Sequence, residues 1–310
     1  MRLRKNFIIS VISVLFLLSL FIGYQDAFAK DAGNLVDTQW LADNLSKVKV
    51  VFVDNWPSAK ESYEKKHIAG SVYMGIGALM GTISPNPPDK IQFEGMMNRL
   101  GINNDDHVVL YGPDGESVFT LGALWLMEYF NHKNVSYLDG GLAKWNKENR
   151  ASESGMKKAE AGNYKVSGTD ESIRIIADDV LKNMKKSNVV LVDARGTGEY
   201  NGEVNNDKNK RVGHLEGAID IDSKLNFNED SGTVKSAADL KGLYEGKGVT
   251  KDKEVIAYCQ GGIKASNAYF ILKHVLGYKN VKVYVGSWGE WSGLDFNKYP
   301  IVGKIVEEKK

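Results

Sequence analysis

Short apolar runs alternate with amphipathic stretches along most of this chain. The runs have the length of buried strands, and the stretches between them place apolar residues at helical spacing. This alternation predicts an α/β fold in which helices cover both faces of a parallel sheet. In the second half the predicted strands are Asn188–Val192, Glu254–Tyr258 and Val281–Val285, and the predicted helices are Ala177–Lys185, Ala237–Tyr244 and Ala265–Leu276.

The second half of the chain repeats the first at a nearly constant offset of 146 or 147 residues. A unit of this length is too long for a solenoid repeat and indicates a duplicated domain. The matched segments are Gly101–Gly112 with Gly248–Cys259, Asn134–Gly141 with Asn280–Ser287, and His67–Ser71 with His214–Ala218.

The duplication predicts two tandem domains, each a parallel sheet with helices on both faces. We place them at residues 30–150 and 173–305. Residues 151–172 are the predicted linker, because the segment from Asn146 to Ser167 is polar and holds few large apolar residues.

The first 29 residues have the pattern of a secretory signal peptide. Arg2, Arg4 and Lys5 precede the apolar run Phe7–Gly23, and Ala27-Phe28-Ala29 supplies the small residues of a cleavage site. We therefore expect a protein exported to the periplasm or the extracellular space. The alternative is an uncleaved membrane anchor, because the apolar run approaches spanning length.

Charge and composition narrow the possible partners. Forty basic residues against thirty-nine acidic ones give no net field, which argues against a nucleic-acid partner. A single cysteine excludes an internal disulfide, and the five histidines show no spacing typical of a metal site. We expect a small-molecule substrate and no metal.

The only cysteine, Cys259, lies where a predicted strand ends and a helix begins. Gly261 and Gly262 allow a sharp turn there, and the amide N–H groups of such a turn bind anions. The same field stabilises a thiolate. We expect a reactive sulfur, ringed by main-chain donors and open toward the seam between the two halves. The alternative is a small buried hydrophobe.

Several motifs in the chain resemble those of the tandem-domain rhodaneses, which are thiosulfate sulfurtransferases. The resemblance covers nearly all of the chain after the N-terminal apolar segment. The residues that carry it are Asp193-Ala194-Arg195 with Tyr200, Gly213–Ala218, the loop Cys259–Lys264, and Gly286–Trp291.

The first half resembles the inactive domain of these proteins, because Gly112 stands where the second half has its cysteine. That domain closes one side of the active-site cleft in the family. Trp56 matches a tryptophan that lines the cleft in some relatives, although ordinary packing explains it equally well.

The resemblance implies a two-step transfer through Cys259. Its thiolate takes the outer sulfur of thiosulfate, sulfite leaves, and the persulfide passes its sulfur to cyanide or a thiol. No cofactor is expected, because the reacting sulfur itself accepts the electrons. The residues expected to bind substrate are the loop residues Gln260, Gly261, Gly262, Ile263 and Lys264, together with Arg195 and Arg211.

Both arginines also have a structural interpretation. Arg195 follows a strand end and could instead pair with a nearby carboxylate, and Arg211 could belong to a solvated basic loop that includes Lys208 and Lys210. His67 and His214 lie in turn motifs far from Cys259 in sequence. We interpret both histidines as structural groups that hold a loop by hydrogen bonds.

Other activities stay open. Mercaptopyruvate is an alternative donor, although relatives that prefer it tend to carry Cys-Gly-x-Gly-Val-Thr, which this loop does not match. A non-catalytic persulfide carrier or redox sensor needs the same nucleophile. A cysteine phosphatase is disfavoured, because it needs an arginine six positions after the cysteine, where this chain has Ala265.

Overall fold

The computed structural model describes residues 33–54, 58–75, 86–116, 118–205 and 209–306. The predicted signal segment 1–29, Trp56 and Lys208 lie outside these ranges. Residues from Asn34 onward form one compact unit. No helix in the described part of the chain is long and apolar enough to cross a membrane.

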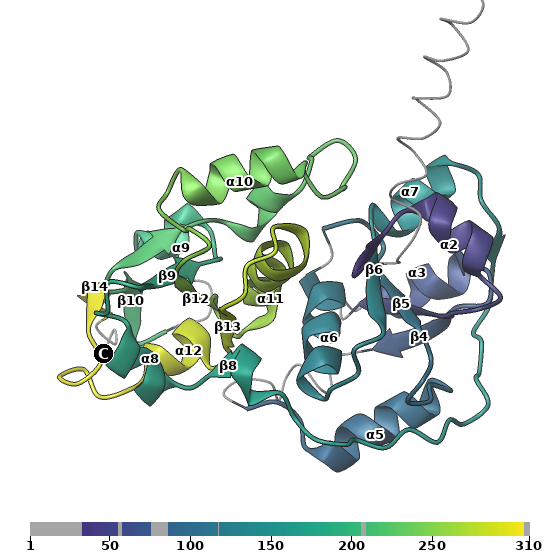
Figure 1. Ribbon diagram of the computed structural model, residues 1–310, viewed down its shortest axis with the longest axis horizontal. Coiled ribbons are helices and arrows are strands. Elements are labelled where there is room, and N and C mark those ends of the chain that lie inside the picture. Colours follow the sequence, from purple (N-terminus) through teal and green to yellow (C-terminus); the bar gives the residue numbers. More distant parts are fainter. Residues whose placement is uncertain (1–32, 55–57, 76–85, 117, 206–208, 307–310) are drawn as a thin grey trace, which may run out of the picture. The chain divides into compact units, whose positions relative to one another are not determined.

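The first half contains a five-stranded parallel sheet in the order β1-β6-β5-β2-β4 (Figure 1). Its central strands are buried on both sides, which explains their unbroken apolar runs. The strands are β1 (Leu35–Val36), β2 (Lys49–Asp54), β4 (Val72–Gly75), β5 (Val108–Tyr111) and β6 (Val135–Leu138).

Helices cover both faces of this sheet. Val51 and Leu110 pack into the core of one face, and Phe52 and Val109 pack into the core of the other. The first face is covered by α5 (Lys90–Arg99) and α6 (Val118–Tyr129), and the second by α2 (Thr38–Asn44), α3 (Ala59–Lys65) and α7 (Gly141–Lys147).

The second half repeats this sheet, with the order β11-β9-β12-β13-β8 and all strands parallel. Each strand occupies the place of its counterpart in the first half, so the duplication read from the sequence is confirmed. The strands are β8 (Arg174–Ile175), β9 (Val189–Asp193), β11 (Ala218–Asp220), β12 (Glu254–Tyr258) and β13 (Val281–Tyr284).

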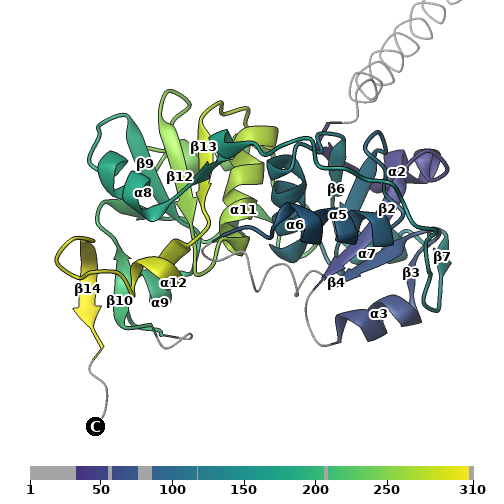
Figure 2. The ribbon, with the colours of Figure 1, turned by 90° about the horizontal axis from the view of Figure 1, so that it is seen from below.

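Helices again cover both faces of the sheet, as Figure 2 shows for α8, α11 and α12. One core includes α10 (Ala237–Glu245) and α11 (Ile263–Phe270), and the other includes α8 (Ala177–Asn183) and α12 (Ser287–Trp291). The short α9 (Thr197–Tyr200) and the 3-10 turns Glu171–Ile173 and Ser223–Asn226 complete this half.

The helix predicted at Ala265–Leu276 differs from the observed one. It begins two residues earlier, at Ile263, and its last turn, Ile271–Val275, is a π-helix. Such turns are rare in proteins. Periodicity does not reveal them, because apolar spacing hardly changes over one turn.

The two histidines have equivalent structural roles. The Nδ1 atoms of His67 and His214 lie 2.8 Å from the carbonyl oxygens of Tyr63 and Tyr200, and each ring stacks on that tyrosine. The prediction that they hold turns in place is therefore confirmed.

The chain between the two sheets runs along the first half. Its β7 (Ser152–Glu153) pairs with β3 (His67–Ile68), and the buried Tyr164 donates its amide to Asn98. The two-stranded antiparallel ribbon of β10 (Arg211–Leu215) and β14 (Ile301–Ile305) borders the second sheet. Of the predicted linker 151–172, only Tyr164 and Val166 are buried, and most of the other residues are exposed along the surface.

Candidate active site

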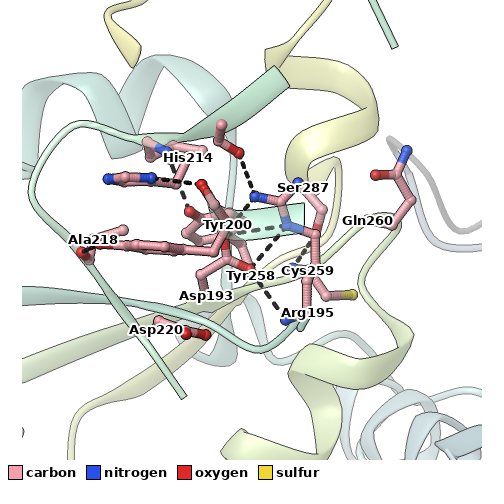
Figure 3. Close-up of polar contacts among 12 residues, drawn as sticks. Asp193, Arg195, Tyr200, His214, Ala218, Asp220, Tyr258, Cys259, Gln260 and Ser287 are labelled. Atoms are coloured by element: carbon pink, nitrogen blue, oxygen red, sulfur yellow. Dashed lines mark hydrogen bonds and ion pairs between the residues drawn. The ribbon is translucent and has the colours of Figure 1, made fainter. Parts of the chain in front are cut away.

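Cys259 directly follows β12, the central strand of the second sheet, at its carboxyl end. Binding sites of open α/β sheets gather at this edge. Figure 3 shows the sulfur pointing away from the stacked rings of Tyr200 and His214. The residue is therefore placed where a loop between strand and helix can present it.

Helix α12 holds the two carbonyl groups at the start of this loop. The amide of Trp288 donates to the oxygen of Cys259 at 2.9 Å, and that of Gly289 donates to the oxygen of Gln260 at 2.8 Å. Both carbonyl oxygens are thus turned toward α12. The partial negative charge of the two carbonyl oxygens therefore points toward α12 and away from the other side of the loop.

The amide groups of the loop are left available to a ligand. Within the described residues, no protein acceptor is recorded for the N–H groups of Gln260, Gly261 and Gly262. The N–H groups of Ile263 and Lys264 belong to the first turn of α11 and have no intrahelical partner. Five consecutive donors therefore form a cradle suited to an anion.

Gly262 makes this geometry possible. It caps α11 with a φ of +88°, a left-handed conformation that side chains rarely adopt. Lys264 is half-buried in the following turn, and no ion pair is recorded for it in the part of the chain that the structure describes. The cradle is thus supplemented by one ammonium group.

The thiol itself is buried, contrary to the open sulfur expected from the sequence. Cys259 is only 2% exposed and joins an apolar cluster with Ala257, Ala265 and Ala268. The cause is its place at the end of a strand that is covered on both faces. The side chain therefore offers little surface to solvent.

Arg195 does not face a substrate either. Its guanidinium is 2% exposed, pairs with Asp193 at 2.6 Å and donates to the oxygen of Gly213. Burial acts to lower the pKa of Arg195, but hydrogen bonds and charge from Asp193 outweigh it and raise that pKa. The guanidinium also lies over the Trp288 ring at 4.7 Å. The structural interpretation of this arginine is therefore correct.

Arg211 is likewise committed to the protein. Its guanidinium donates to the carbonyl oxygens of Trp291, Ser292 and Tyr299, and it lies 4.6 Å from the Phe296 ring. The residue is 2% exposed, and burial lowers its pKa. The alternative of a solvated basic loop is therefore wrong for Arg211, and its assignment to substrate binding stays a prediction.

Ser287 supports the loop, a role that was not predicted from the sequence. Its hydroxyl accepts the amide of Cys259 at 3.1 Å and donates to the oxygen of Tyr284 at 2.7 Å. Ser287 is fully buried at a φ of +53°, where its counterpart Gly141 has +56°. A serine in place of the glycine of the other repeat was the available signal.

The model of the rhodanese-like domain matches this chain twice, at residues 37–148 and 176–294. The chain belongs to the rhodanese-like family. Each matched segment contains four of the five strands of one sheet, all but β1 and β8, and only the second supplies a cysteine at the loop.

Relatives within this family cover nearly the whole folded chain. The sulfur carrier protein TtuD of Thermus thermophilus is 38% identical over 274 residues, covering 84% of this chain and 94% of that protein. A protein of Mycobacterium tuberculosis named "Putative thiosulfate sulfurtransferase" is 34% identical over 267 residues, covering 84% and 95%.

A solved structure shows the same two-domain rhodanese architecture. The crystal structure of SseA from Escherichia coli, described with the 3-mercaptopyruvate sulfotransferases, matches with a TM-score of 0.73 and 27% identity. The match covers 83% of this chain and 99% of that one.

No group of three or more histidine, cysteine, aspartate or glutamate side chains able to hold a metal occurs among the residues that the structure describes.

Proposed function

We propose that this rhodanese-like protein is a sulfurtransferase that moves sulfane sulfur from thiosulfate to cyanide or a thiol. The observation that carries the proposal is the lone cysteine, followed by five amide donors for which no acceptor is recorded among the residues that the structure describes. The name of the Mycobacterium relative, "Putative thiosulfate sulfurtransferase", also supports sulfur transfer. The fold alone would support many activities, so the loop is the stronger argument.

The reaction balances without a cofactor. The thiolate of Cys259 attacks the outer sulfur of thiosulfate, a new S–S bond forms, and the old bond breaks as sulfite leaves with the electron pair. The resulting persulfide is an anion, which the loop amides and Lys264 stabilise. The acceptor then attacks the outer sulfur, and the thiolate of Cys259 leaves.

Mass spectrometry after thiosulfate treatment tests the nucleophile. We expect the native protein to gain the mass of one sulfur atom and Cys259→Ser to gain none. A gain on both proteins, or on neither, would reject the Cys259 persulfide. Steady production of thiocyanate from thiosulfate and cyanide would then establish turnover.

A persulfide carrier is the second candidate function. The name of the Thermus relative and the burial of the thiol favour it, because a carrier must shield its sulfur until a partner arrives. One sulfur loaded per chain with no thiocyanate turnover would support the carrier, whereas sustained turnover would exclude it.

Mercaptopyruvate is the alternative donor, favoured by the similarity to SseA and by the loss of both arginines from the site. With Lys264 as the loop cation, a monoanionic donor needs less charge compensation than dianionic thiosulfate. Comparing kcat/KM for the two donors decides between them.

We also propose that the protein is exported, on the basis of the N-terminal sequence pattern. Fractionation of producing cells, followed by N-terminal sequencing of the protein, tests this. A protein that begins at Lys30 outside the cytoplasm would support cleavage after Ala29, and an intact N-terminus in the membrane fraction would support an anchor.

A further inference from the structure

The side chain that follows the nucleophile is held by a pair of amide hydrogen bonds. Nε2 of Gln260 donates to Oδ1 of Asn209 at 2.9 Å, and Nδ2 of Asn209 donates to Oε1 of Gln260 at 3.3 Å. The two residues are 51 positions apart in the chain. Asn209 immediately precedes Lys210 and β10, so this contact ties the segment before β10 to the reacting loop.

Asn209 is itself fixed from two sides. The side chain of Asn205 holds the main chain of Asn209 by two hydrogen bonds. The N–H of Asn209 donates to Oδ1 of Asn205 at 2.8 Å, and the carbonyl oxygen of Asn209 accepts from Nδ2 of Asn205 at 3.0 Å. The hydroxyl of Ser292, at the end of α12, contacts Oδ1 of Asn209 at 3.4 Å. The partner of Gln260 is therefore a rigid group rather than a loose surface side chain.

Gln260 is also constrained at its main chain. Its carbonyl oxygen accepts the amide of Gly289, and a Cβ atom at Gly289 would come within 2.9 Å of that oxygen and 3.5 Å of Nε2. The Gln260 side chain thus passes close to α12, which has no side chain at this point. Backbone and side chain of Gln260 are held by different elements.

We propose that Asn209 is a positioning residue for sulfur transfer. By holding Gln260 it fixes the peptide groups that follow Cys259, so that the free loop amides converge on one anion.

This inference rests on the proposed persulfide chemistry and concerns its first step. Asn209 touches no reacting atom, so its effect passes through Gln260. Removing either partner should then have the same consequence, and removing both should add nothing further.

Single-turnover loading of sulfur from thiosulfate tests the pair. We expect Asn209→Ala and Gln260→Ala each to lower the saturating loading rate about fivefold, the loss typical of one hydrogen bond. The double variant should be no slower than either. The thiosulfate concentration for half-saturation should change less than about twofold, because alignment rather than donor binding is lost.

Two further variants sharpen the test. Asn209→Asp still accepts from Nε2 of Gln260 but offers no donor to Oε1, so it should load at least as slowly as Asn209→Ala. Asn201→Ala removes an exposed amide of the same segment whose side chain donates only weakly to Glu203, and it should load at the native rate.

The outcomes distinguish failure of the proposed sulfur transfer from failure of the positioning role of Asn209. A native protein that acquires no sulfur rejects the proposed function itself. A native protein that loads, with Asn209→Ala loading equally fast or with additive effects of the two alanine variants, rejects the positioning role alone. If Asn209→Ala does not fold, loading by Gln260→Ala at the native rate has the same meaning.

Discussion

Ser287 occupies a backbone conformation that favours glycine, yet it carries a side chain. The equivalent glycine of the first half, Gly141, could not accept one, since a Cβ there would lie 2.5 Å from the oxygen of Asp114. In the second half the hydroxyl of Ser287 takes the amide of Cys259. The strain is tolerated because that buried N–H would otherwise have no acceptor.

Comparing Ser287→Ala with Ser287→Gly distinguishes the effect of losing the hydroxyl from the effect of relieving the backbone strain. We expect Ser287→Ala to lower the free energy of unfolding by about 2 kcal/mol, because it leaves a buried amide unpaired. Ser287→Gly should lose about 1 kcal/mol less, because glycine relieves the left-handed strain. Both should slow sulfur loading equally. Urea denaturation and single-turnover loading measure the two effects, and equal destabilisation would argue against strain at Ser287.

The burial of Cys259 predicts slow alkylation of the native protein. Iodoacetamide should react at least about a hundredfold more slowly with the folded chain than with the chain in urea, because reaction requires a local opening. In a Cys259 persulfide, iodoacetamide would alkylate the outer sulfur. Reduction would then remove the alkylated sulfur and return Cys259 as a free thiol, so protection by thiosulfate should be measured after reduction. Rapid modification of the native protein would show that the sulfur is accessible in solution.

At the scale of elements, the two buried arginines hold together the structure that supports the loop. Arg195 links the end of β9 to β10 and lies over Trp288 of α12. Arg211 links β10 to the chain that follows α12. Because α12 also binds the loop carbonyls, both residues support the site without contacting its ligand.

Arg211→Lys tests this assignment. A lysine cannot reach three carbonyl oxygens with one ammonium group, so we expect the free energy of unfolding to fall by about 2 kcal/mol. Loading per folded molecule should stay within about twofold of the native rate. Arg99→Lys, an exposed control, should change neither. A large rise in the half-saturating thiosulfate concentration at unchanged stability would instead give Arg211 a direct role in binding.

The sequence predicted the elements well because their apolar periodicity depends on local spacing. The strands around Val190, Ile256 and Val283 and the helices beside them all occur. The partners of Arg195 and Arg211 were not predictable in this way. The carbonyls that hold Arg211 lie about eighty residues downstream, and only the folded chain brings them together.

In the Cys259 loop, too, features set by neighbouring residues were predictable, and features set by distant segments were not. Glycines after Cys259 correctly indicated a turn at the start of a helix, with amide donors left open. The burial of the sulfur depends instead on elements packed over both faces of the sheet. The amide pair of Gln260 with Asn209 also joins distant segments, and no spacing rule reveals it.

At the scale of the whole folded unit, the side chains of Glu128 and His274 join equivalent helices of the two halves. Glu128 of α6 and His274 of the π-turn lie 146 positions apart, the same offset that relates the strands after them. Nε2 of His274 is 3.0 Å from Oε1 of Glu128, and the Tyr269 hydroxyl donates to Oε2 at 2.7 Å. Lys273 donates to that hydroxyl in turn.

This cluster connects the helix that begins at the Cys259 loop to the equivalent helix of the first half. Both Glu128 and His274 have side chains only 11% exposed. Burial acts to raise the pKa of Glu128, but hydrogen bonds from His274 and Tyr269 and the charges of His274 and Lys273 lower it overall. The ionised carboxylate of Glu128 is therefore stabilised by folding.

The sign of the pH dependence follows from this shift. A carboxyl group whose pKa is lower in the folded than in the unfolded chain adds its full stability above the ordinary value of 4.5. It loses this stability progressively as the pH falls from that value through the lower pKa of the folded chain. Glu128→Gln should therefore cost about 2 kcal/mol of unfolding free energy at pH 7 and progressively less below about pH 4.5.

Urea denaturation of native protein and Glu128→Gln between pH 7 and pH 3.5 measures this difference. Glu64→Gln is the matched control. The Glu64 carboxylate lies 3.9 Å from the Lys60 ammonium group and is well exposed, so this variant should cost less than about 0.5 kcal/mol throughout. A cost for Glu128→Gln that stays constant over this range would mean that the cluster stabilises the helix pair by packing rather than by charge. A cost that vanishes with acid would show that the ionised carboxylate of Glu128 joins the equivalent helices of the two repeats.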